Sequence, residues 1–328
     1  MRIIGASDIA ALVSMPEAIR LMALAFGELS AGRAQAPLRT GIHLDASALD
    51  ALIMPATVPA ANALGVKLVT VAGNNPANGL PLIHATVLIV DPKTGVPLAL
   101  LDGTTITALR TGAVSGAATE RLSRQDAKVL VVYGAGVQAL TQILAVCAVR
   151  EIERIVVVGR SKAGLDRFQT WLTERAPELV DRTDLTTDRT AARDADIICA
   201  ATTSQVPVLD DRDVRAGTHI NAVGAYTPSM QEIPTATVVR SMIVVDQLEA
   251  ALEEAGDFVI PIRSGELRAA DVTVELGHLV NGDHPGRTSP EQVTFFKSVG
   301  NAVQDMVVAR KAFDLAEQQG IGQVVSLR

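Results

Sequence analysis

Short apolar runs separated by Gly, Pro, Asn and Asp fill residues 39–103, and this pattern predicts strands joined by turns. The runs are RTGIHLD, ALIMPAT, LGVKLVTV, IHATVLIVD and VPLALLDG. Residues Asp91–Gly95 separate the last two runs and have the composition of a hairpin turn. Several strands, with a hairpin between the last two, are therefore expected in the first third of the chain.

Two helices are predicted on either side of these strands. The first covers residues 14–32, where Ser14 and Glu17 have capping-box spacing, Pro16 lies in the first turn and Gly32 can end the helix. The second covers residues 104–123 and is rich in Ala, Gly, Ser and Thr.

The pattern changes near residue 123, where fully apolar runs begin to alternate with helical stretches. The runs are AKVLVVYG, RIVVVGR, ADIICAAT, THINAVG and SMIVVDQ. Strands that are buried on both faces and separated by helices are typical of a parallel α/β sheet. A last helical region is expected from Ser289, with Pro290 and Gln292 at its start, to Gly320.

Composition narrows the choice of partners. The chain has 328 residues, enough for about two domains, and a formal net charge of −7 with only 3% aromatic residues. Neither nucleic acid nor an anionic membrane is an expected partner. Cys147 and Cys199 lie in apolar runs and are expected to be reduced. The N-terminus lacks a signal-peptide pattern, and no apolar run reaches the ~18 residues of a membrane span, so a cytoplasmic protein is expected.

The segment VLVVYGAGVQAL joins a predicted strand to a predicted helix through Gly-x-Gly-x-x-Ala. In a Rossmann unit, the first glycine (here Gly134) allows the tight turn. The second (Gly136) lets the backbone approach a pyrophosphate, and the third small residue (Ala139) allows close packing. The next strand follows at a βαβ distance, which favours dinucleotide binding over a glycine-rich turn in a non-binding domain.

The end of that next strand bears on which dinucleotide binds. NAD-binding proteins usually place an acid there for the ribose 2′-hydroxyl, whereas this chain has Gly159-Arg160-Ser161-Lys162. A guanidinium can bind a 2′-phosphate in bidentate fashion. NADPH is therefore the expected cofactor, with NADH as a possibility and a solvated Arg160 as the alternative.

Cations in unusual settings suggest a substrate site. Lys67 has apolar neighbours on both faces of its strand, which is costly unless the ammonium has a partner or a role. Arg110 lies among small residues and suits a carboxylate. Arg39 is a weaker candidate, and His84 is more simply a structural residue. The alternatives are a lysine that reaches solvent at a sheet edge and a surface arginine. No spacing supports a metal site.

The segments GVKLVTVAGNNPANGLP, DGTTITALRTGA, YGAGVQAL and FFKSVGNAVQD, in this order, resemble the ornithine cyclodeaminase/μ-crystallin family over nearly the whole chain. That family includes cyclodeaminases, an alanine dehydrogenase and reductases of cyclic ketimines. The resemblance implies an α/β fold with a Rossmann-type doubly wound parallel sheet and a discontinuous α+β domain. Residues 1–115 and 301–328 would form the substrate-binding and dimerisation domain, and residues 116–300 the dinucleotide-binding domain.

The resemblance also implies roles for individual residues. Lys67 matches an active-site lysine, and Arg110 and Arg39 match contacts to the substrate carboxylate. Val299 is expected near the nicotinamide. The full expected cofactor set is Thr111, Gly134, Ala135, Gly136, Val137, Gln138, Arg160, Ser161, Thr202, Val223, Ser298 and Gly300.

One position departs from the cyclodeaminase pattern. Cyclodeaminases carry an aspartate after the Gly-Ala of a strand-end loop, whereas this chain reads NAVGAYTPSMQEIP, with Tyr226 in that place. A phenol is not an ionised base at pH 7. The change argues against cyclodeamination and leaves C=N reduction intact, with Tyr226 as a candidate to cap the substrate ring or pass a proton.

The expected function is therefore NADPH-dependent reduction of a small cyclic imino acid. A homodimer is what the family resemblance implies. Δ1-Pyrroline-2-carboxylate, giving proline, is the first candidate substrate, and Δ1-piperideine-2-carboxylate, giving pipecolate, is the second. One alternative is an NAD-dependent cyclodeaminase or amino-acid dehydrogenase. Another is a non-catalytic NADPH-binding protein of the crystallin kind.

Overall fold

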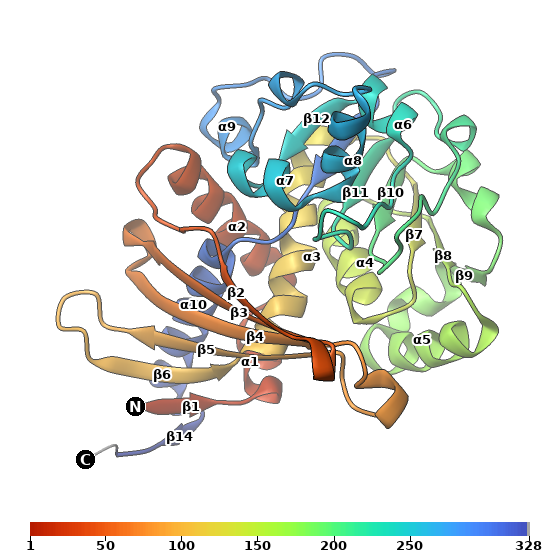
Figure 1. The fold of residues 1–328 in the computed structure, drawn as a ribbon. Coiled ribbons are helices and arrows are strands. Elements are labelled where there is room, and N and C mark those ends of the chain that lie inside the picture. The colour runs from red at the N-terminus through yellow and green to blue at the C-terminus, as the bar shows by residue number, and fades with distance from the viewer. Residues whose placement is uncertain (327–328) are drawn as a thin grey trace. The chain divides into compact units, whose positions relative to one another are not determined.

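The computed structural model describes residues 1–326 and divides into two compact units, shown in Figure 1. Unit 1 contains Met1–Arg110 and the chain from Asn301 onward, and unit 2 contains Thr111–Gly300. The boundary falls inside helix α3 (Gly103–Leu122), a few residues before the position expected from sequence.

Unit 1 is built on a mostly antiparallel sheet with the strand order β14-β1-β6-β5-β4-β3-β2. Among the strands of this sheet that the structure describes, only β1 and β6 pair in parallel. The strands are β1 (Arg2–Ile4), β2 (Thr40–Leu44), β3 (Leu49–Val58), β4 (Ala63–Ala72), β5 (Ile83–Val90), β6 (Pro97–Asp102) and β14 (Gln323–Val324). The expected hairpin is present between β5 and β6, where Asp91 Oδ1 accepts from the amides of Lys93 and Thr94 and Gly95 has a φ of 71°.

Helices cover one face of this sheet. The helices of unit 1 besides α3 are α1 (Ala6–Leu12), α2 (Met15–Ser30) and α10 (Ala302–Gln319). Helix α10 packs against β3, β4, β5 and α2, as Figure 1 shows. Ser14 caps α2 as expected, accepting from the amide of Glu17, but the carboxylate of Glu17 pairs with Arg20 and Lys311 instead of completing a capping box.

Unit 2 contains a fully parallel sheet with the strand order β12-β13-β11-β10-β7-β8-β9. The strands are β7 (Val129–Tyr133), β8 (Arg154–Val158), β9 (Thr183–Thr186), β10 (Ile197–Ala200), β11 (His219–Ala222), β12 (Met242–Val245) and β13 (Thr294–Lys297). The chain order reverses between β7 and β10, which is the switch point of a doubly wound sheet. The predicted Rossmann-type fold is confirmed.

The remaining helices of unit 2 connect these strands. They are α4 (Val137–Val149), α5 (Lys162–Arg175), α6 (Thr235–Arg240), α7 (Leu248–Glu254), α8 (Gly256–Ser264) and α9 (Leu276–Asn281). Apolar side chains of β7, β8, β10, α4 and α5 form a buried core cluster, in which Leu130, Ile143 and Phe168 are completely buried.

The predicted single helix from Ser289 to Gly320 is wrong in its first part. Residues Thr294–Lys297 form β13, which lies between β11 and β12, and α10 begins only at Ala302 after the cap Asn301. The Ser-Pro-x-Gln start signal was misleading, because the β-branched and aromatic residues that follow it are stabilised by two neighbouring strands.

Within residues 1–326 no single helix is long and apolar enough to cross a membrane, although α1 and α2, which meet at 85°, pass that test as a pair. Ile9, Met22 and Phe26 of this pair are completely buried in the protein.

Candidate functional site

The sheet and α10 of unit 1 bring together buried charges that are far apart in sequence. Lys67 lies on β4, between Met54 of β3 and Val87 of β5, on the face that α10 covers. Its side chain is 1% exposed, and its Nζ lies 2.7 Å from Oδ2 of Asp305, which is completely buried in the first turn of α10.

Arg110 joins the same cluster from α3. Its Nε lies 3.4 Å from Oδ1 of Asp305, and its Nη1 donates to Oε1 of Gln304 at 2.9 Å. Gln304 Oε1 also accepts from the amide of Asn301, which fixes the amide side chain at the start of α10. One carboxylate is therefore shared by two cations, so the group of Lys67, Arg110 and Asp305 carries a formal net charge of +1.

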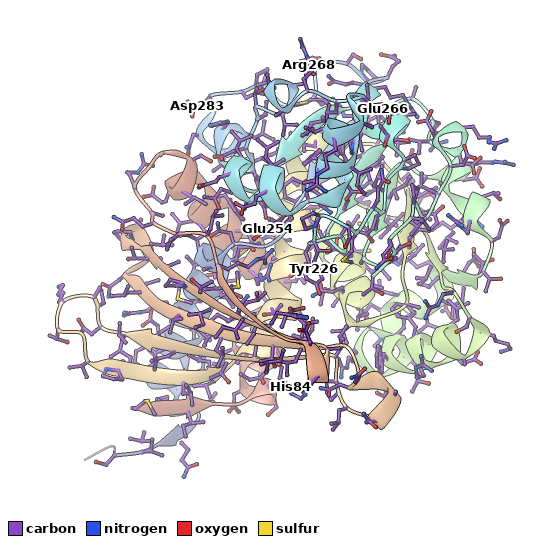
Figure 2. All side chains as sticks on the ribbon, in the orientation of Figure 1. His84, Tyr226, Glu254, Glu266, Arg268 and Asp283 are labelled. Carbon is purple, nitrogen blue, oxygen red and sulfur yellow. The ribbon has the colours of Figure 1, made fainter. Side chains whose placement is uncertain are left out.

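The environment changes the acidity of Lys67. Burial lowers its pKa from the ordinary 10.5 to about 8. The negative charge of Asp305 opposes this shift and raises the pKa, whereas the positive charges of Arg110 and Arg39 contribute to lowering it to that value. Arg39, just before β2, is thus close enough to act electrostatically on Lys67, and the structure gathers the three cations that the sequence singled out. His84, in contrast, is exposed on β5 (Figure 2).

The strand-turn-helix motif of unit 2 has the geometry that a dinucleotide pyrophosphate requires. Gly134 follows β7 with a φ of 112°, and a Cβ there would lie 2.5 Å from the carbonyl oxygen of Ala201. Gly136 faces open space, and Ala139 is buried in the core. The first-turn amides of Val137 and Gln138 have no preceding helical carbonyl to bond, so they can bind an anion where the helix dipole favours one.

Apart from Thr111, the other expected cofactor residues lie at or near the carboxyl ends of strands of the unit 2 sheet. Arg160 and Ser161 follow β8; Arg160 is exposed, and Ser161 Oγ caps α5 by accepting from the amide of Gly164. Ala135 is in the motif itself, Thr202 follows β10, Val223 follows β11, and Ser298 and Gly300 follow β13. Thr111 is buried in α3, where its carbonyl accepts from Gln142 of α4.

Tyr226 lies in unit 2, in the loop after β11, and is partly buried (Figure 2). Glu232, which the sequence could not place, is completely buried and accepts hydrogen bonds from backbone amides. Its carboxylate therefore holds loops together and is not positioned as a replacement for the missing aspartate.

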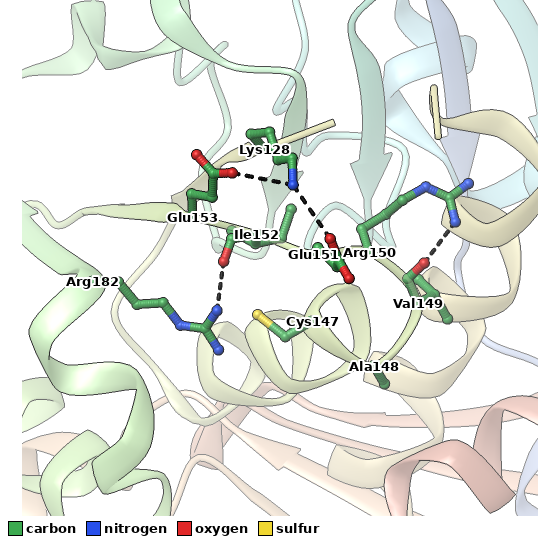
Figure 3. A pocket seen from close by; sticks show the side chains of 9 residues that line it. All are labelled: Lys128, Cys147, Ala148, Val149, Arg150, Glu151, Ile152, Glu153 and Arg182. Atoms are coloured by element: carbon green, nitrogen blue, oxygen red, sulfur yellow. Dashed lines mark hydrogen bonds and ion pairs between the residues drawn. The ribbon is translucent and has the colours of Figure 1, made fainter. Parts of the chain in front are cut away.

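A surface hollow elsewhere in unit 2 is not a dinucleotide site. It is lined by Lys128, Cys147, Ala148, Val149, Arg150, Glu151, Ile152, Glu153 and Arg182 (Figure 3). These residues lie near the amino ends of β7 and β8, opposite the edge where such sheets bind ligands. Lys128 pairs with Glu151 and Glu153, and burial raises the pKa of the Cys147 thiol to about 11, so the thiol is protonated at neutral pH.

The sequence analysis missed several buried charged residues. Asp305 is the shared partner of Lys67 and Arg110, and Asp246, Asp257 and Lys297 are completely buried in unit 2. A usable signal was present, because each of these charged residues stands beside apolar residues, as in AVQDMVV and IVVDQ. Within residues 1–326 no group of His, Cys, Asp and Glu side chains could hold a metal ion.

Fold and site together define a dinucleotide-binding α/β protein with a second unit that holds a buried, net positive cluster. The chain belongs to the ornithine cyclodeaminase/mu-crystallin family, whose model matches residues 2–320. The resemblance inferred from the sequence motifs is thereby confirmed.

Proteins similar to this chain include two reductases and a dehydrogenase. The Δ1-pyrroline-2-carboxylate reductase of Bacillus cereus is 40% identical over 326 residues, covering 98% of this chain and 99% of that protein. The structure of the Thermococcus litoralis Δ1-pyrroline-2-carboxylate reductase in complex with NADH and L-proline matches with a TM-score of 0.94 and 39% identity, covering 99% of this chain and 100% of the other. An archaeal alanine dehydrogenase dimer with bound NAD matches with a TM-score of 0.91 and 30% identity, covering 100% and 99%.

Proposed function

We propose that this chain is an NADPH-dependent ketimine reductase that reduces the C=N bond of a small cyclic imino acid. Δ1-Pyrroline-2-carboxylate, giving L-proline, is the first substrate, and Δ1-piperideine-2-carboxylate, giving L-pipecolate, is the second. The observation that carries the proposal is the cluster of Lys67, Arg110 and Asp305, with Arg39 nearby, in a chain 40% identical to a reductase of the first substrate.

The cations of unit 1 suit the substrate carboxylate. Arg110 offers a planar guanidinium whose Nη1 is already oriented by Gln304, and Arg39 adds a second guanidinium on the β2 side. The partly desolvated setting strengthens such a pair, and holding the imino acid in one orientation can contribute several kcal/mol of barrier reduction.

In this proposal Lys67 donates the proton to the imine nitrogen. The reaction adds a hydride to the imine carbon and a proton to the ring nitrogen, and NADPH, when bound, supplies the hydride. Asp305 keeps the Lys67 ammonium in place at 2.7 Å. The lowered pKa of Lys67, about 8, makes its ammonium a usable proton donor near neutral pH, directly or through a water.

We propose that unit 1 binds the imino acid and unit 2 binds the dinucleotide through the cofactor residues named above. Arg160 is the proposed contact to the 2′-phosphate, because it is exposed at the end of β8, where an acid would favour NADH. Arg160→Ala should raise KM for NADPH about tenfold or more and leave KM for NADH within about twofold. Equal changes in KM for both cofactors would show that Arg160 does not contact the 2′-phosphate. Lys162→Ala is the control, because the ammonium of Lys162 already pairs with Asp166.

Tyr226 is proposed to contact the substrate ring. Its phenol replaces the aspartate of cyclodeaminases, and Tyr226→Phe tests whether the hydroxyl takes part. A large loss in kcat would assign a proton-transfer role to the hydroxyl, whereas unchanged kinetics would limit the ring to a packing role.

We propose that the enzyme is a homodimer formed through the sheet of unit 1. The face opposite α10 carries several apolar side chains that are more than a third exposed, namely Ile3, Ile42, Leu44, Ile53 and Leu68. The strand register places all of them on that one face. An apolar sheet face of this kind favours association with another copy, and the similar alanine dehydrogenase is a dimer.

A cytoplasmic location is proposed as well. Cys147 and Cys199 are free thiols, which fits a reducing compartment, and the proposed imine reduction consumes NADPH, an intracellular cofactor.

The test of the function is an absorbance assay at 340 nm with purified protein. Δ1-Pyrroline-2-carboxylate is supplied with NADPH or NADH, and L-ornithine with NAD runs in parallel. Rapid loss of NADPH absorbance and no reaction with ornithine is the expected result.

The second candidate is an NAD-dependent amino-acid dehydrogenase or cyclodeaminase, favoured by the similarity to an alanine dehydrogenase with bound NAD. NADH formation from alanine, or ammonia release from ornithine, with no imine reduction would establish it in place of the reductase. Tight NADPH binding without turnover of any of these substrates would instead support a non-catalytic binding protein.

A further inference from the structure

The loops at one half of the carboxyl edge of the unit 2 sheet are held by buried carboxylates. In a doubly wound sheet, the first βα turn binds the pyrophosphate and the next strand end binds the adenosine ribose. The nicotinamide half therefore lies at the loops after β10, β11 and β13. These loops contain the expected cofactor residues Thr202, Val223, Ser298 and Gly300.

Glu232 connects the first two of these loops. Its Oε1 accepts from the amide of Thr202 at 2.6 Å and from the hydroxyl of Thr202 at 2.8 Å. Its Oε2 accepts from the amides of Gly224 at 2.7 Å and Ala225 at 2.9 Å. Each oxygen thus holds a different loop. A Cβ at Gly224 would overlap the backbone of Thr202, so the two loops are in close contact at this point.

Asp246 holds the loop after β13 in the same way. Its Oδ2 accepts from the hydroxyl of Ser298 at 2.7 Å and from the amides of Val299 at 3.0 Å and Gly300 at 2.9 Å. Its Oδ1 accepts from the amide of Gln247 at 2.8 Å. Asp246 is completely buried, directly after β12.

An ion pair joins the two carboxylates into one network. Asp257 Oδ1 accepts from the amides of Glu232 and Ile233 at 2.8 and 3.0 Å, and its Oδ2 lies 2.8 Å from Nζ of Lys297. Lys297 is the last residue of β13, and its carbonyl accepts from the amide of Asp246. The connection runs from the loop after β10 to the loop after β13.

We propose that Glu232 and Asp246 are positioning residues that set the loops for the nicotinamide half of the dinucleotide, an inference that rests on the proposed function. Burying several charges costs desolvation free energy, and apolar residues of similar volume often stabilise a protein equally well. Stability alone therefore does not explain these buried carboxylates. Here they accept hydrogen bonds from backbone amides of three different loops.

The variant Glu232→Gln tests this role. A carboxylate presents acceptors to both loops, whereas a glutamine presents one oxygen and one NH2 group, which repels the amide donors of one loop. Binding of NADPH and of 2′-phospho-ADP-ribose, a probe that lacks nicotinamide, is measured by calorimetry on the full chain. We expect the Kd for NADPH to rise at least tenfold, with kcat falling, while the Kd for the probe stays within twofold.

The matched control is Asp196→Asn. Asp196 is also a buried carboxylate that accepts from two backbone amides, those of Lys128 and Val129, but it lies at the amino edge of the same sheet. This variant should lower the melting temperature without separating NADPH binding from probe binding. Equal weakening of both ligands in Glu232→Gln, or the same separation in Asp196→Asn, would overturn the proposal.

Two further points keep the outcome decisive. If Glu232→Gln does not fold, Asp246→Asn is measured in the same way, and a change of less than twofold in the ratio of the two Kd values would overturn the proposal. The binding comparison does not depend on the imine, so wild-type protein that binds NADPH but reduces no imino acid would reject the proposed function and leave this test intact.

Discussion

Lys67 keeps a charge in a position where an isolated ammonium would be neutralised. Burial lowers its pKa to about 8, and Asp305 at 2.7 Å opposes that shift. The lysine was predictable because it stands in an apolar strand. Asp305 was missed although it also stands among apolar residues, because an acid in the first turn of a helix is ordinarily a surface residue that favours the helix dipole.

Replacing Lys67 should separate chemistry from cofactor binding. Lys67→Ala is expected to lower kcat/KM for Δ1-pyrroline-2-carboxylate by about 10²-fold or more, with the Kd for NADPH unchanged because the residue belongs to unit 1. Steady-state kinetics and NADPH fluorescence titration give the two quantities. An equal loss in both would make Lys67 a structural residue.

The pH dependence follows from the same lysine. If the ammonium form is active, kcat/KM should fall as the pH rises through about 8, where Lys67 loses its proton. Between this value and the ordinary 10.5, the unfolded state binds more protons, so the contribution of Lys67 to stability rises with pH. The loss of activity therefore should not coincide with unfolding caused by this group.

Asp305→Asn supplies the control for that profile. Removing the charge that raises the pKa of Lys67 should move the alkaline limb of kcat/KM to lower pH. A limb that stays in place in this variant would assign it to another group.

At the scale of elements, the strand-turn-helix motif combines two glycines with different roles. Gly134 has a φ of 112° and no room for a Cβ, whereas Gly136 has a φ of −108° and open space beside it. Both positions were identified from the motif, but only the structure shows that a Cβ would overlap the backbone of Ala201 at the first and would meet open space at the second.

The two alanine variants should therefore behave differently. Gly134→Ala is expected to destabilise the protein by about 1–3 kcal/mol through strain and overlap with Ala201. Gly136→Ala should change the free energy of unfolding by less than about 0.5 kcal/mol, but weaken NADPH binding at least tenfold because the methyl group occupies the approach to the backbone. Denaturant unfolding and calorimetry distinguish the two, and intact NADPH binding in Gly136→Ala would contradict this assignment.

The error at β13 also belongs to this scale. The segment VTFFK has no strong alternation, and a helix-start signal precedes it. Its strand state depends on pairing with β11 and β12, which come from earlier parts of the chain. The local sequence of a segment contains no information on such pairing with distant strands.

At the scale of the whole molecule, the proposed dimer is the property most open to direct measurement. Leu68 and Ile53 are register partners on the uncovered sheet face, with exposures of 48% and 39%. Leu68→Lys places a charge in the middle of this face and should raise the dimer dissociation constant at least tenfold, about 1.4 kcal/mol, as read by sedimentation velocity.

Val206→Lys is the matched control, because Val206 is 63% exposed and belongs to unit 2, not to that sheet. It should leave the association unchanged. Wild-type protein that sediments as a monomer at micromolar concentration would reject the proposed interface.

The sequence by itself determined the family, the parallel sheet, the glycine turn and the cations Lys67 and Arg110, because each depends on a short pattern or on a charge in an apolar run. The tertiary structure alone decided which carboxylates accompany them. Asp305 lies 238 positions from Lys67 along the chain, and Glu232 and Asp246 hold loops from other strands. Such partners are selected by packing in three dimensions, where a buried charge must find its complement.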